Sequence, residues 1–485
     1  MARAPPCDEV VCLHPCYPWS PTTLQRFNNL TWAEPFFLKR SRFFSFVRKR
    51  SQKTVKNGPL PVKPRMLLLF TLLCAAVASW QSVYAATITV TNTNDSGPGS
   101  LRQTLAFAQD GDTIEFSVTG TIMLTSGPLS VPESKAINIS GPGANALVIS
   151  GNATTFLFSL GRGTVSISDL ALTNGKNSSS DGGAIRMFTG SKLTLTNCII
   201  SNNSTASNGG AIYVTGHNVC PAQLETNLTL NYCTVSGNSA AIHGGAISST
   251  PMGSSCGRTI VTINNCTISG NSAGLNGGAF YNSPFGTLRF GLARLIVSNS
   301  TLSGNSAREG GAIRSYAGGR ADPGLAEVIV RNSTIIDNAA RGLGDSISNG
   351  GRLARVTIGD TILKGRASGA NIYNGGGTVT SLGYNLCSDN GAGYLTAAGD
   401  QINITNPMVG PLQNNGGPTL THELLPGSPA IDHGNPGFSP PPDEDQRGCP
   451  FGRVFNSRID IGSFESQPMS PPCPTPRPRP TPVPR

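Results

Sequence analysis

Gly244-Gly245-Ala246-Ile247 is one copy of a tetrapeptide that recurs through the middle of this chain. The other copies are Gly182-Gly183-Ala184-Ile185, Gly209-Gly210-Ala211-Ile212, Gly277-Gly278-Ala279-Phe280 and Gly310-Gly311-Ala312-Ile313. Their first glycines are 27, 35, 33 and 33 residues apart, and similar text, such as LTLNYCTVSGN and VTINNCTISGN, precedes each later copy. The chain is therefore built from an internal repeat of about 33 residues.

The text inside the repeat predicts strands rather than paired helices. Leu228-Thr229-Leu230 and Val261-Thr262-Ile263 alternate apolar with polar residues, and no helix-forming run is long enough to compete. If each repeat is one coil of three short strands, equivalent residues stack about 4.8 Å apart. We therefore expect an all-β chain, a right-handed parallel β-helix whose coils are stabilised mainly by their neighbours.

Two columns of residues support this stacking. A small, mostly apolar column suits the inside of a narrow coil and consists of Cys198, Cys233, Cys266, Ser300 and Ser333. Five residues later in each repeat stands a second column: Asn203, Asn238, Asn271, Asn305 and Asn338. We expect these amides to hydrogen-bond along the stack, at a turn where the Asn backbone can adopt left-handed φ. Likewise, each glycine pair allows a corner that is too tight for a Cβ.

The N-terminal part of the chain differs from the repeats. Residues 1–65 carry 12 Lys/Arg against 3 Asp/Glu and show no repeat. Met66 is preceded by Lys63 and Arg65 and followed by an apolar run, and Val83-Tyr84-Ala85 supplies a small-x-small cleavage site. We expect a signal peptide at 66–85, with translation starting at or near Met66. The alternative is an uncleaved anchor, although the run is shorter than the about 20 residues that a membrane span needs.

This division also explains the charge. The chain has a formal net charge of +10, but residues 1–65 supply +9 of it and the arginines of the C-terminal tail +3, which leaves the body at about −2. A basic chain would otherwise suggest nucleic-acid binding. We expect no nucleic-acid partner and no integral membrane segment in the mature chain.

Both ends of the repeat region have their own sequence character. Ser100 can cap a short helix, Leu101 to Gln109, which would cover the open N-terminal end of the solenoid. The segment Thr89–Phe116 resembles the N-terminal cap of secreted bacterial β-helix proteins. The repeats resemble the GGAI and polymorphic-outer-membrane-protein repeats of bacterial surface proteins. The text Gly410–Pro436, with DQRG (Asp445–Gly448) and DIGSFE (Asp460–Glu465), is similar to the closing region of choice-of-anchor surface proteins.

This resemblance implies the architecture and a secreted, cell-surface or outer-membrane-associated location, but no particular reaction. The predicted organisation is a basic extension (1–65), a signal peptide (66–85), an N-terminal cap with the first coils (86–160), repeat coils (161–365), last coils with a C-terminal cap that includes SPAID and DIGSF (366–465), and a proline-rich tail (466–485).

The cysteines fall into different groups. Cys220 and Cys256 lie in two long loops that leave adjacent coils at equivalent places, so we expect a disulfide between them in an exported protein. The alternative is two free thiols. Cys198, Cys233 and Cys266 are expected to be buried free thiols, because in-register side chains run parallel and an odd number cannot all pair. Cys387 and Cys449 form a further candidate pair. No metal site is indicated, because no second Cys or His stands at ligand spacing.

A search for catalytic residues predicts none. A lyase needs several carboxylates around Ca²⁺ with a basic residue, and a hydrolase needs two carboxylates roughly 5–10 Å apart. The column before the glycine pairs consists of Asp181, Asn208, His243, Asn276 and Glu309. Its two acids are four coils apart, about 19 Å at the sheet spacing. We expect an exposed binding column here, with His243, like His217, a solvated residue rather than a base.

These observations predict a secreted or cell-surface, adhesin-like structural protein that binds polysaccharide or surface glycans without catalysis or cofactor. The alternative is a polysaccharide lyase or glycoside hydrolase whose site lies in long loops, including the one with Asp322.

Overall fold

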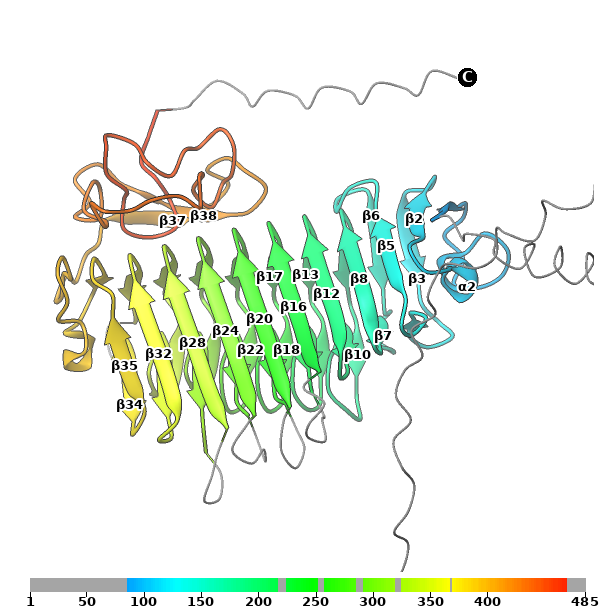
Figure 1. Ribbon diagram of the computed structural model, residues 1–485, viewed down its shortest axis with the longest axis horizontal. Helices are drawn as coiled ribbons and strands as arrows, with labels where there is room; N and C mark the ends of the chain where they lie inside the picture. Colours follow the sequence, from blue (N-terminus) through cyan, green and yellow to red (C-terminus); the bar gives the residue numbers. More distant parts are fainter. Residues whose placement is uncertain are drawn as a thin grey trace, which may run out of the picture. The chain divides into compact units, whose positions relative to one another are not determined.

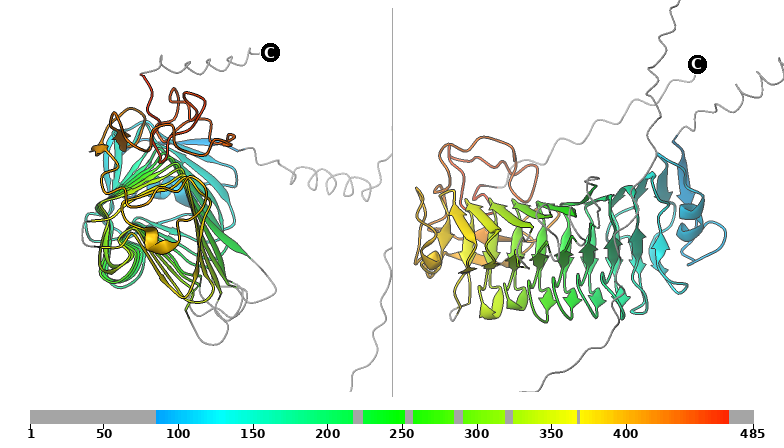
Figure 2. Two further views of the ribbon diagram at one scale, coloured as in Figure 1. Left: turned by 90° about the vertical axis from the view of Figure 1, so that its left-hand side faces the viewer. Right: turned by 60° about the horizontal axis from the view of Figure 1, so that its bottom comes forward.

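The chain forms a parallel β-helix, shown in Figure 1. The computed structural model describes residues 85–468 except 217–223, 252–256, 285–290, 319–323 and 367–368. Each regular coil passes through four stacked sheets in the order A, B, D and C, and all the pairs within these sheets are parallel. Seen from the end, the coils lie over one another, as Figure 2 shows.

Sheets A and B hold the strands that the alternating pattern predicted. Sheet A consists of β1 (Thr87–Val90), β2 (Thr113–Phe116), β5 (Ala136–Ser140), β8 (Gly163–Ser168), β12 (Ser191–Thr196), β16 (Glu225–Asn231), β20 (Arg258–Asn264), β24 (Leu292–Ser298), β28 (Leu325–Arg331), β32 (Ala354–Gly359) and β35 (Thr378–Ser381). Sheet B consists of β3 (Gly120–Met123), β6 (Leu147–Ser150), β9 (Ala171–Thr173), β13 (Ile199–Ser201), β17 (Thr234–Ser236), β21 (Thr267–Ser269), β25 (Thr301–Ser303), β29 (Thr334–Ile336), β33 (Ile362–Lys364) and β36 (Leu386–Cys387).

Sheets D and C lie before and after the glycine pairs. Sheet D consists of β10 (Lys176–Asn177), β14 (Ser204–Thr205), β18 (Ser239–Ala240), β22 (Ser272–Ala273), β26 (Ser306–Glu309) and β30 (Ala339–Leu343). Sheet C consists of β4 (Leu129–Ser130), β7 (Phe158–Leu160), β11 (Ile185–Met187), β15 (Ile212–Val214), β19 (Ile247–Ser249), β23 (Phe280–Asn282), β27 (Ile313–Tyr316), β31 (Ile347–Gly350) and β34 (Ile372–Gly375).

Three strands per coil were predicted, but each regular coil has four. Sheet D was missed because several of its strands, such as β18 and β22, have only two residues, too few to show an alternating pattern.

The repeat register places the alternating residues as expected. Leu228 pairs with Val261 and Leu230 with Ile263, and all four side chains are fully buried. Thr229 and Thr262, on the opposite face of sheet A, are only partly buried. Burial of apolar area at about 25 cal/mol per Å² stabilises the stack coil by coil.

The Asn column forms a buried ladder. Asn238 Nδ2 donates to Asn271 Oδ1 (2.9 Å), and that oxygen also accepts from the Asn238 backbone N–H (3.0 Å). Asn271 makes the same two contacts to Asn305. The predicted ladder is confirmed, but left-handed φ was assigned to the wrong residue. It occurs one residue earlier, for example at Gly237 (φ 64°) and Gly270 (φ 62°).

The thiols of the column Cys198, Cys233 and Cys266 bond to backbone groups at the corner between sheets A and B. Cys198, Cys233 and Cys266 are buried free thiols, as predicted. The Cys266 thiol donates to the Asn264 carbonyl oxygen (3.0 Å), and its sulfur accepts from the Cys233 backbone N–H (3.3 Å). Each thiol follows a residue with left-handed φ, such as Asn265 (φ 55°). The small side chain thus satisfies backbone groups at the corner between sheets A and B.

The two ends of the solenoid are closed differently. Helix α2 (Leu101–Phe107) packs Leu101 and Leu105 into the core, and the Ser100 hydroxyl caps it by accepting from the Gln103 N–H (3.3 Å), as predicted. At the other end, the short 3-10 helix η1 (Gly391–Gly393) leads into Leu395, which is buried in the same core.

The SPAID and DIGSF segments lie against the side of the solenoid. Together with the antiparallel pair β37 (Val409–Gln413) and β38 (Thr421–Leu424), they form a module over residues 404–468, here called the C-terminal module. Its Leu424, Ala430, Ile461 and Phe464 pack against Ile336, Ile362 and Leu386 of sheet B. Figure 1 shows the module, in orange and red, beside the last coils.

Cys387 is a buried free thiol and Cys449 is disulfide-bonded, so the predicted Cys387–Cys449 pair is wrong. Cys387 lies on the inner face of β36, where its sulfur donates to Asp389 Oδ1 (3.0 Å). Among the described residues, no helix is both long and apolar enough to cross a membrane.

Candidate functional site

The predicted binding column lies beside the outer face of sheet C. Its members are stacked as expected: Asn208 Nδ2 donates to Asp181 Oδ1 (2.8 Å), Asn276 Nδ2 lies 3.1 Å from His243 Nδ1, and backbone bridges join His243 to Asn276 and Asn276 to Glu309. All five are half-buried rather than exposed. They were expected to be exposed because the sequence does not show that the glycine corner folds them towards sheet C.

The glycine corner has two parts. The first glycine of each pair has left-handed φ, as at Gly244 (66°) and Gly277 (67°). At the second glycine, a Cβ would meet a backbone oxygen of the next coil: for Gly278 it would lie 2.1 Å from the Gly311 oxygen. In the last, degenerate copy Asp345 takes the second position, and Gly365 and Gly369 leave room for its side chain.

His243 is a packed residue, not a solvated one. Its ring stacks on Tyr281, with centroids 4.2 Å apart and planes at 18°. Burial, with a smaller contribution from the Arg314 charge, lowers the pKa of His243 to about 4. The ring is therefore neutral at neutral pH, and with Asn276 beside it, it offers hydrogen-bonding groups rather than charge.

The acids of the column are held by neighbours. Glu309 Oε2 lies 3.2 Å from Arg314 Nη2, and the Arg314 guanidinium lies 5.0 Å from the Tyr316 ring centroid. Asp181 accepts from both the side chain and the backbone of Asn208. In these contacts, the partners of the two carboxylates are Arg314 and Asn208.

A second column was missed from the sequence. The central residues of the sheet C strands stand in register on its outer face: Ser159, Arg186, Tyr213, Ser248, Tyr281, Arg314, Ser348 and Tyr373. Each comes directly after the apolar residue of the tetrapeptide copy or its equivalent, so the repeat alignment contained the signal. Aromatic rings, guanidinium groups and hydroxyls thus share one stripe. Four of its members, Tyr213, Ser248, Tyr281 and Ser348, are buried, and the other four are half-buried.

A pocket of about 450 Å³ opens at the N-terminal end of this stripe. Its lining consists of Ser130, Val131, Glu133, Ser134, Ser159, Gly161, Arg162, Phe188 and Thr189. Phe188 is 38% exposed, and the Arg186 guanidinium lies 5.1 Å from its ring centroid. Glu133 and Arg162 are both exposed. The pocket therefore combines an accessible aromatic ring with one acid, one base and several hydroxyls.

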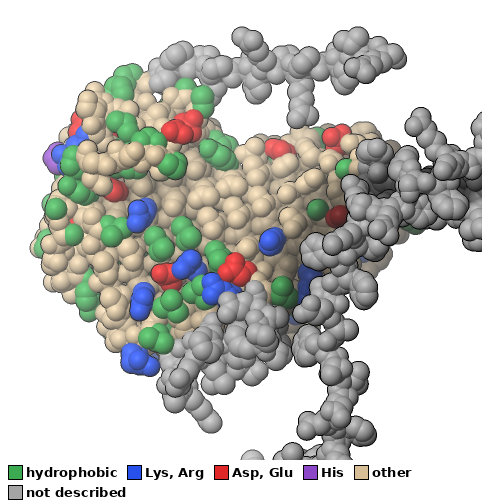
Figure 3. Space-filling view, viewed as in Figure 1, with side chains coloured by type: hydrophobic (Ala, Val, Ile, Leu, Met, Phe, Trp, Pro, Cys, Tyr) green, Lys and Arg blue, Asp and Glu red, His purple; other side chains and the backbone are tan. Residues whose placement is uncertain are grey.

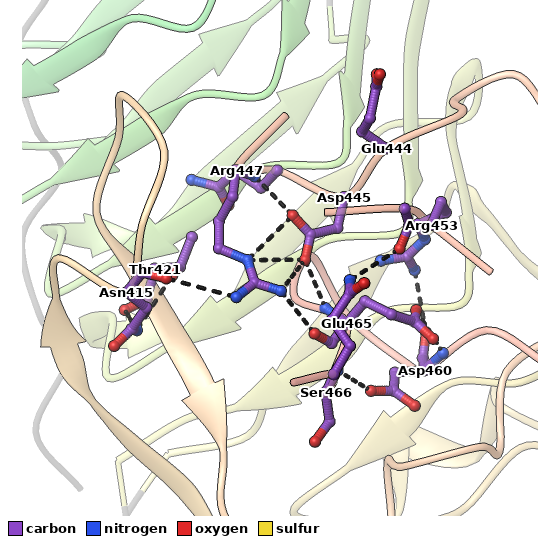
Figure 4. A network of polar contacts seen from close by, with 12 residues as sticks. Asn415, Thr421, Glu444, Asp445, Arg447, Arg453, Asp460, Glu465 and Ser466 are labelled. Atoms are coloured by element: carbon purple, nitrogen blue, oxygen red, sulfur yellow. Dashed lines mark hydrogen bonds and ion pairs between the residues drawn. The ribbon is translucent and has the colours of Figure 1, made fainter. Parts of the chain in front are cut away.

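A third polar cluster is structural. In Figure 4, Arg447 donates to Asp445 through Nη2 (2.6 Å) and to the Glu465 carbonyl oxygen (2.6 Å). The guanidinium lies 3.7 Å and 3.8 Å from the ring centroids of Phe451 and Phe464. The Asp445 and Arg447 side chains are 0% and 4% exposed. This cluster joins the DQRG and DIGSFE segments inside the C-terminal module.

Other predicted positions are not in these sites. Cys220, Cys256, His217 and Asp322 lie outside the described residues, so the proposed Cys220–Cys256 disulfide stays a prediction. Within the part of the chain that the structure describes, no group of three or more His, Cys, Asp or Glu side chains is arranged to hold a metal ion. The face shown in Figure 3 is mainly uncharged, with few charged side chains.

Comparison with known proteins finds one repeat family. Residues 197–215 and 232–250 match the Chlamydia polymorphic membrane protein repeat. No curated protein matches the chain.

Among solved structures, pectate lyase Pel9A is similar at 15% identity and a TM-score of 0.40, over 80% of this chain and 98% of that one. A PL6 alginate lyase in complex with a trisaccharide is similar at 13% identity and a TM-score of 0.29, over 72% and 92% of the two chains. The PL6 alginate lyase AlyGC is similar at 14% identity and a TM-score of 0.27, over 79% and 59%.

Proposed function

We propose that this chain is a secreted or cell-surface β-helix protein that binds glycans on the outer face of sheet C, without cleaving them. The observation that carries the proposal is the 450 Å³ pocket in which Phe188, Glu133 and Arg162 meet. A ring that is 38% exposed offers an apolar face to a pyranose, while a carboxylate and a guanidinium can bond to its hydroxyls. Small-ligand sites typically combine apolar area with a few such polar groups.

Beyond the pocket, the stripe adds little accessible surface. Arg186 lies in register with Tyr213 and is half-buried, whereas Tyr213, Ser248 and Tyr281 are only 3%, 0% and 6% exposed. The proposed binding surface is therefore the pocket, with Arg186 beside it. The repeats that match a polymorphic membrane protein repeat, and the predicted signal peptide, support a location outside the cell.

A glycan array probed with the purified protein tests the proposal, with a parallel assay for reducing ends and unsaturated uronates released from mixed polysaccharides. Binding without release is the expected result. The Phe188→Ala variant should weaken binding of the best array ligand about 10-fold, or about 1.4 kcal/mol, because it removes the stacking face.

Phe107→Ala is the matched control, since Phe107 is 67% exposed on α2 and outside the pocket. It should bind as the parent protein does. Unchanged binding in Phe188→Ala would contradict the assignment to this pocket, and release of product would make the chain an enzyme.

A further inference from the structure

A second groove runs across the outer side of sheet D. It has a volume of about 710 Å³ and is lined by Ser239, Ala240, Ala241, Ser272, Ala273, Gly274, Ser306, Ala307, Ala339, Ala340, Arg341, Asp345 and Arg366. It crosses β18, β22, β26 and β30 and shares no lining residue with the pocket on sheet C. We call it the D groove.

The small side chains of the D groove leave its base open to a ligand. Ala240, Ala273 and Ala307 are its most buried alanines, at 2%, 8% and 4% exposure. Ser239, Ser272 and Ser306 stand in register on successive strands, and Ser272 Oγ donates to Ser239 Oγ (3.3 Å) at an exposed position. Hydroxyls therefore recur at the strand spacing of about 4.8 Å, close to the length of one pyranose unit.

One end of the D groove is basic. Arg341 and Arg366 both line it, and both are exposed. Its one acid, Asp345, is 3% exposed, and its two oxygens accept backbone N–H groups of Ala340 (2.8 Å) and Arg366 (3.1 Å). Neither guanidinium takes part in an ion pair among the described residues. The two arginines therefore present positive charge to whatever occupies the groove.

We propose that the D groove binds an extended acidic glycan. The anionic groups of the glycan, carboxylate or sulfate, meet Arg341 and Arg366, and its hydroxyls meet the serine row. Guanidinium groups form strong, charge-assisted hydrogen bonds with both kinds of anion. This inference goes beyond the proposed function, because it assigns a separate site and a charged ligand class.

Other polymers fit the D groove less well. A peptide that adds as a strand needs a free sheet edge, but β18 and β22 are each paired on both sides. Single-stranded nucleic acid is bound through aromatic side chains on which bases stack, and the lining contains no Phe, Tyr, Trp or His.

Calorimetric titration of the full chain tests the proposal with three probes: a galacturonate oligosaccharide, a heparin-derived sulfated oligosaccharide and a neutral cello-oligosaccharide. At least one of the two acidic probes should bind, and its affinity should fall as the salt concentration rises. The acidic probe that binds more tightly identifies the preferred anion as carboxylate or sulfate. The double variant Arg341→Ala/Arg366→Ala should lose at least 10-fold in affinity for that probe. Ala241→Glu, at an exposed lining position, should also weaken binding by placing a like charge in the groove.

Arg352→Ala/Arg355→Ala is the matched control, because it removes two exposed arginines that do not line the groove. It should bind the acidic probe as the parent protein does. All the titrations are repeated in the Phe188→Ala background, which weakens the sheet C pocket, so that the binding retained there reports on the D groove. The proposal is overturned by equal losses in the two double variants, by full affinity in Arg341→Ala/Arg366→Ala, or by equal binding of the neutral probe in that background. Unchanged thermal unfolding shows that each variant is folded.

Discussion

The two glycines of each pair share one constraint and differ in a second. At the first, a Cβ would lie close to a backbone oxygen, 2.1 Å from that of Phe280 at Gly277, and the backbone also adopts left-handed φ, which costs other residues roughly 1–2 kcal/mol. At the second, φ is not left-handed, but a Cβ would overlap backbone atoms of the next coil. The first position therefore carries both constraints, and the degenerate copy keeps Gly344 there while Asp345 occupies the second position.

Close backbone approach and left-handed φ can be separated by two alanine substitutions, one in a glycine pair and one outside it. Gly278→Ala should destabilise the protein by more than about 3 kcal/mol, because its Cβ would lie 2.1 Å from the Gly311 oxygen. Gly270→Ala should cost only about 1–2 kcal/mol, because Gly270 has left-handed φ (62°) but nothing within 4 Å of an added Cβ. Urea unfolding of both variants measures the difference, and equal costs would contradict the close-approach explanation.

Among the elements, the C-terminal module is joined to sheet B by buried polar groups. Gln446, 0% exposed, accepts from Thr301 Oγ1 (2.6 Å) through Oε1 and donates to Thr267 Oγ1 (3.0 Å) through Nε2. Asn265 Nδ2 donates to the Asp445 carbonyl oxygen (3.0 Å). Outward threonines of sheet B thus serve as docking points, and loss of one partner leaves a buried group unsatisfied, at about 1–3 kcal/mol.

The module should weaken as pH rises. Burial raises the pKa of Glu465 to about 8 and that of Asp460 to about 6. A carboxyl group with a raised folded-state pKa adds stability at low pH, and this stability is lost as pH rises from the unfolded value of about 4 towards the folded value. The loss for Glu465 is on the order of a few kcal/mol and falls between about pH 4 and 8.

Glu465→Gln should flatten this pH dependence, since the amide does not ionise. The contributions of Asp460, Asp445 and Asp360, whose pKa values burial also raises, should remain. Calorimetric unfolding between pH 5 and 9 measures the pH dependence. Glu115→Gln, at an exposed position of β2, controls for substitution at a distant site. A Glu465→Gln profile as steep as that of the parent protein would show that Glu465 is not the group responsible.

For the whole molecule, the fold could be predicted from the sequence because each repeat of a solenoid makes the same contacts with its neighbours, so the same residue types recur at the same positions. The stacking, the Asn ladder and the buried thiols followed from residues in register, such as Asn238 and Asn271. The fourth sheet could not be predicted, because two-residue strands carry no periodicity. The placement of the C-terminal module depends on contacts such as Asn299 to Glu444, 145 residues apart, which no local pattern contains.

The candidate sites were less predictable for a related reason. The column from Asp181 to Glu309 was found by its period, yet its half-buried state depends on how the glycine corner packs it towards sheet C. The pocket brings together Glu133, Arg162 and Phe188 from separate coils. Two of these lie in the first, irregular coils, where no repeat alignment marks them.

Because each coil is stabilised by its neighbours, backbone protection should vary along the axis. Hydrogen exchange should be slowest in β16, β20 and β24, which have strand neighbours on both sides, and faster in β35, which pairs only with β32. In Asn271→Ala, exchange should accelerate in the coils of Asn238 and Asn305, whose amides contact Asn271, and stay unchanged in β2.

Asn264→Ala is the control, since Asn264 lies in the same coil but is only part-buried and bonds to Asn231 on the outer side of sheet A. It should have little effect. Acceleration throughout the solenoid in Asn271→Ala would mean that the coils unfold as one cooperative unit.

The position of the C-terminal module also determines how the molecule would respond to mechanical force. A pull on the chain beyond Glu465 would not first reach the last coil, because Glu465 is tied into a module whose Gln446 and Ser463 are bonded to Thr267, Thr301 and Thr334. The load would be shared among several middle and late coils. Under tension, a solenoid unfolds most easily by losing coils one at a time from its end. Here this unfolding would begin only after the module had dissociated from the side of the solenoid.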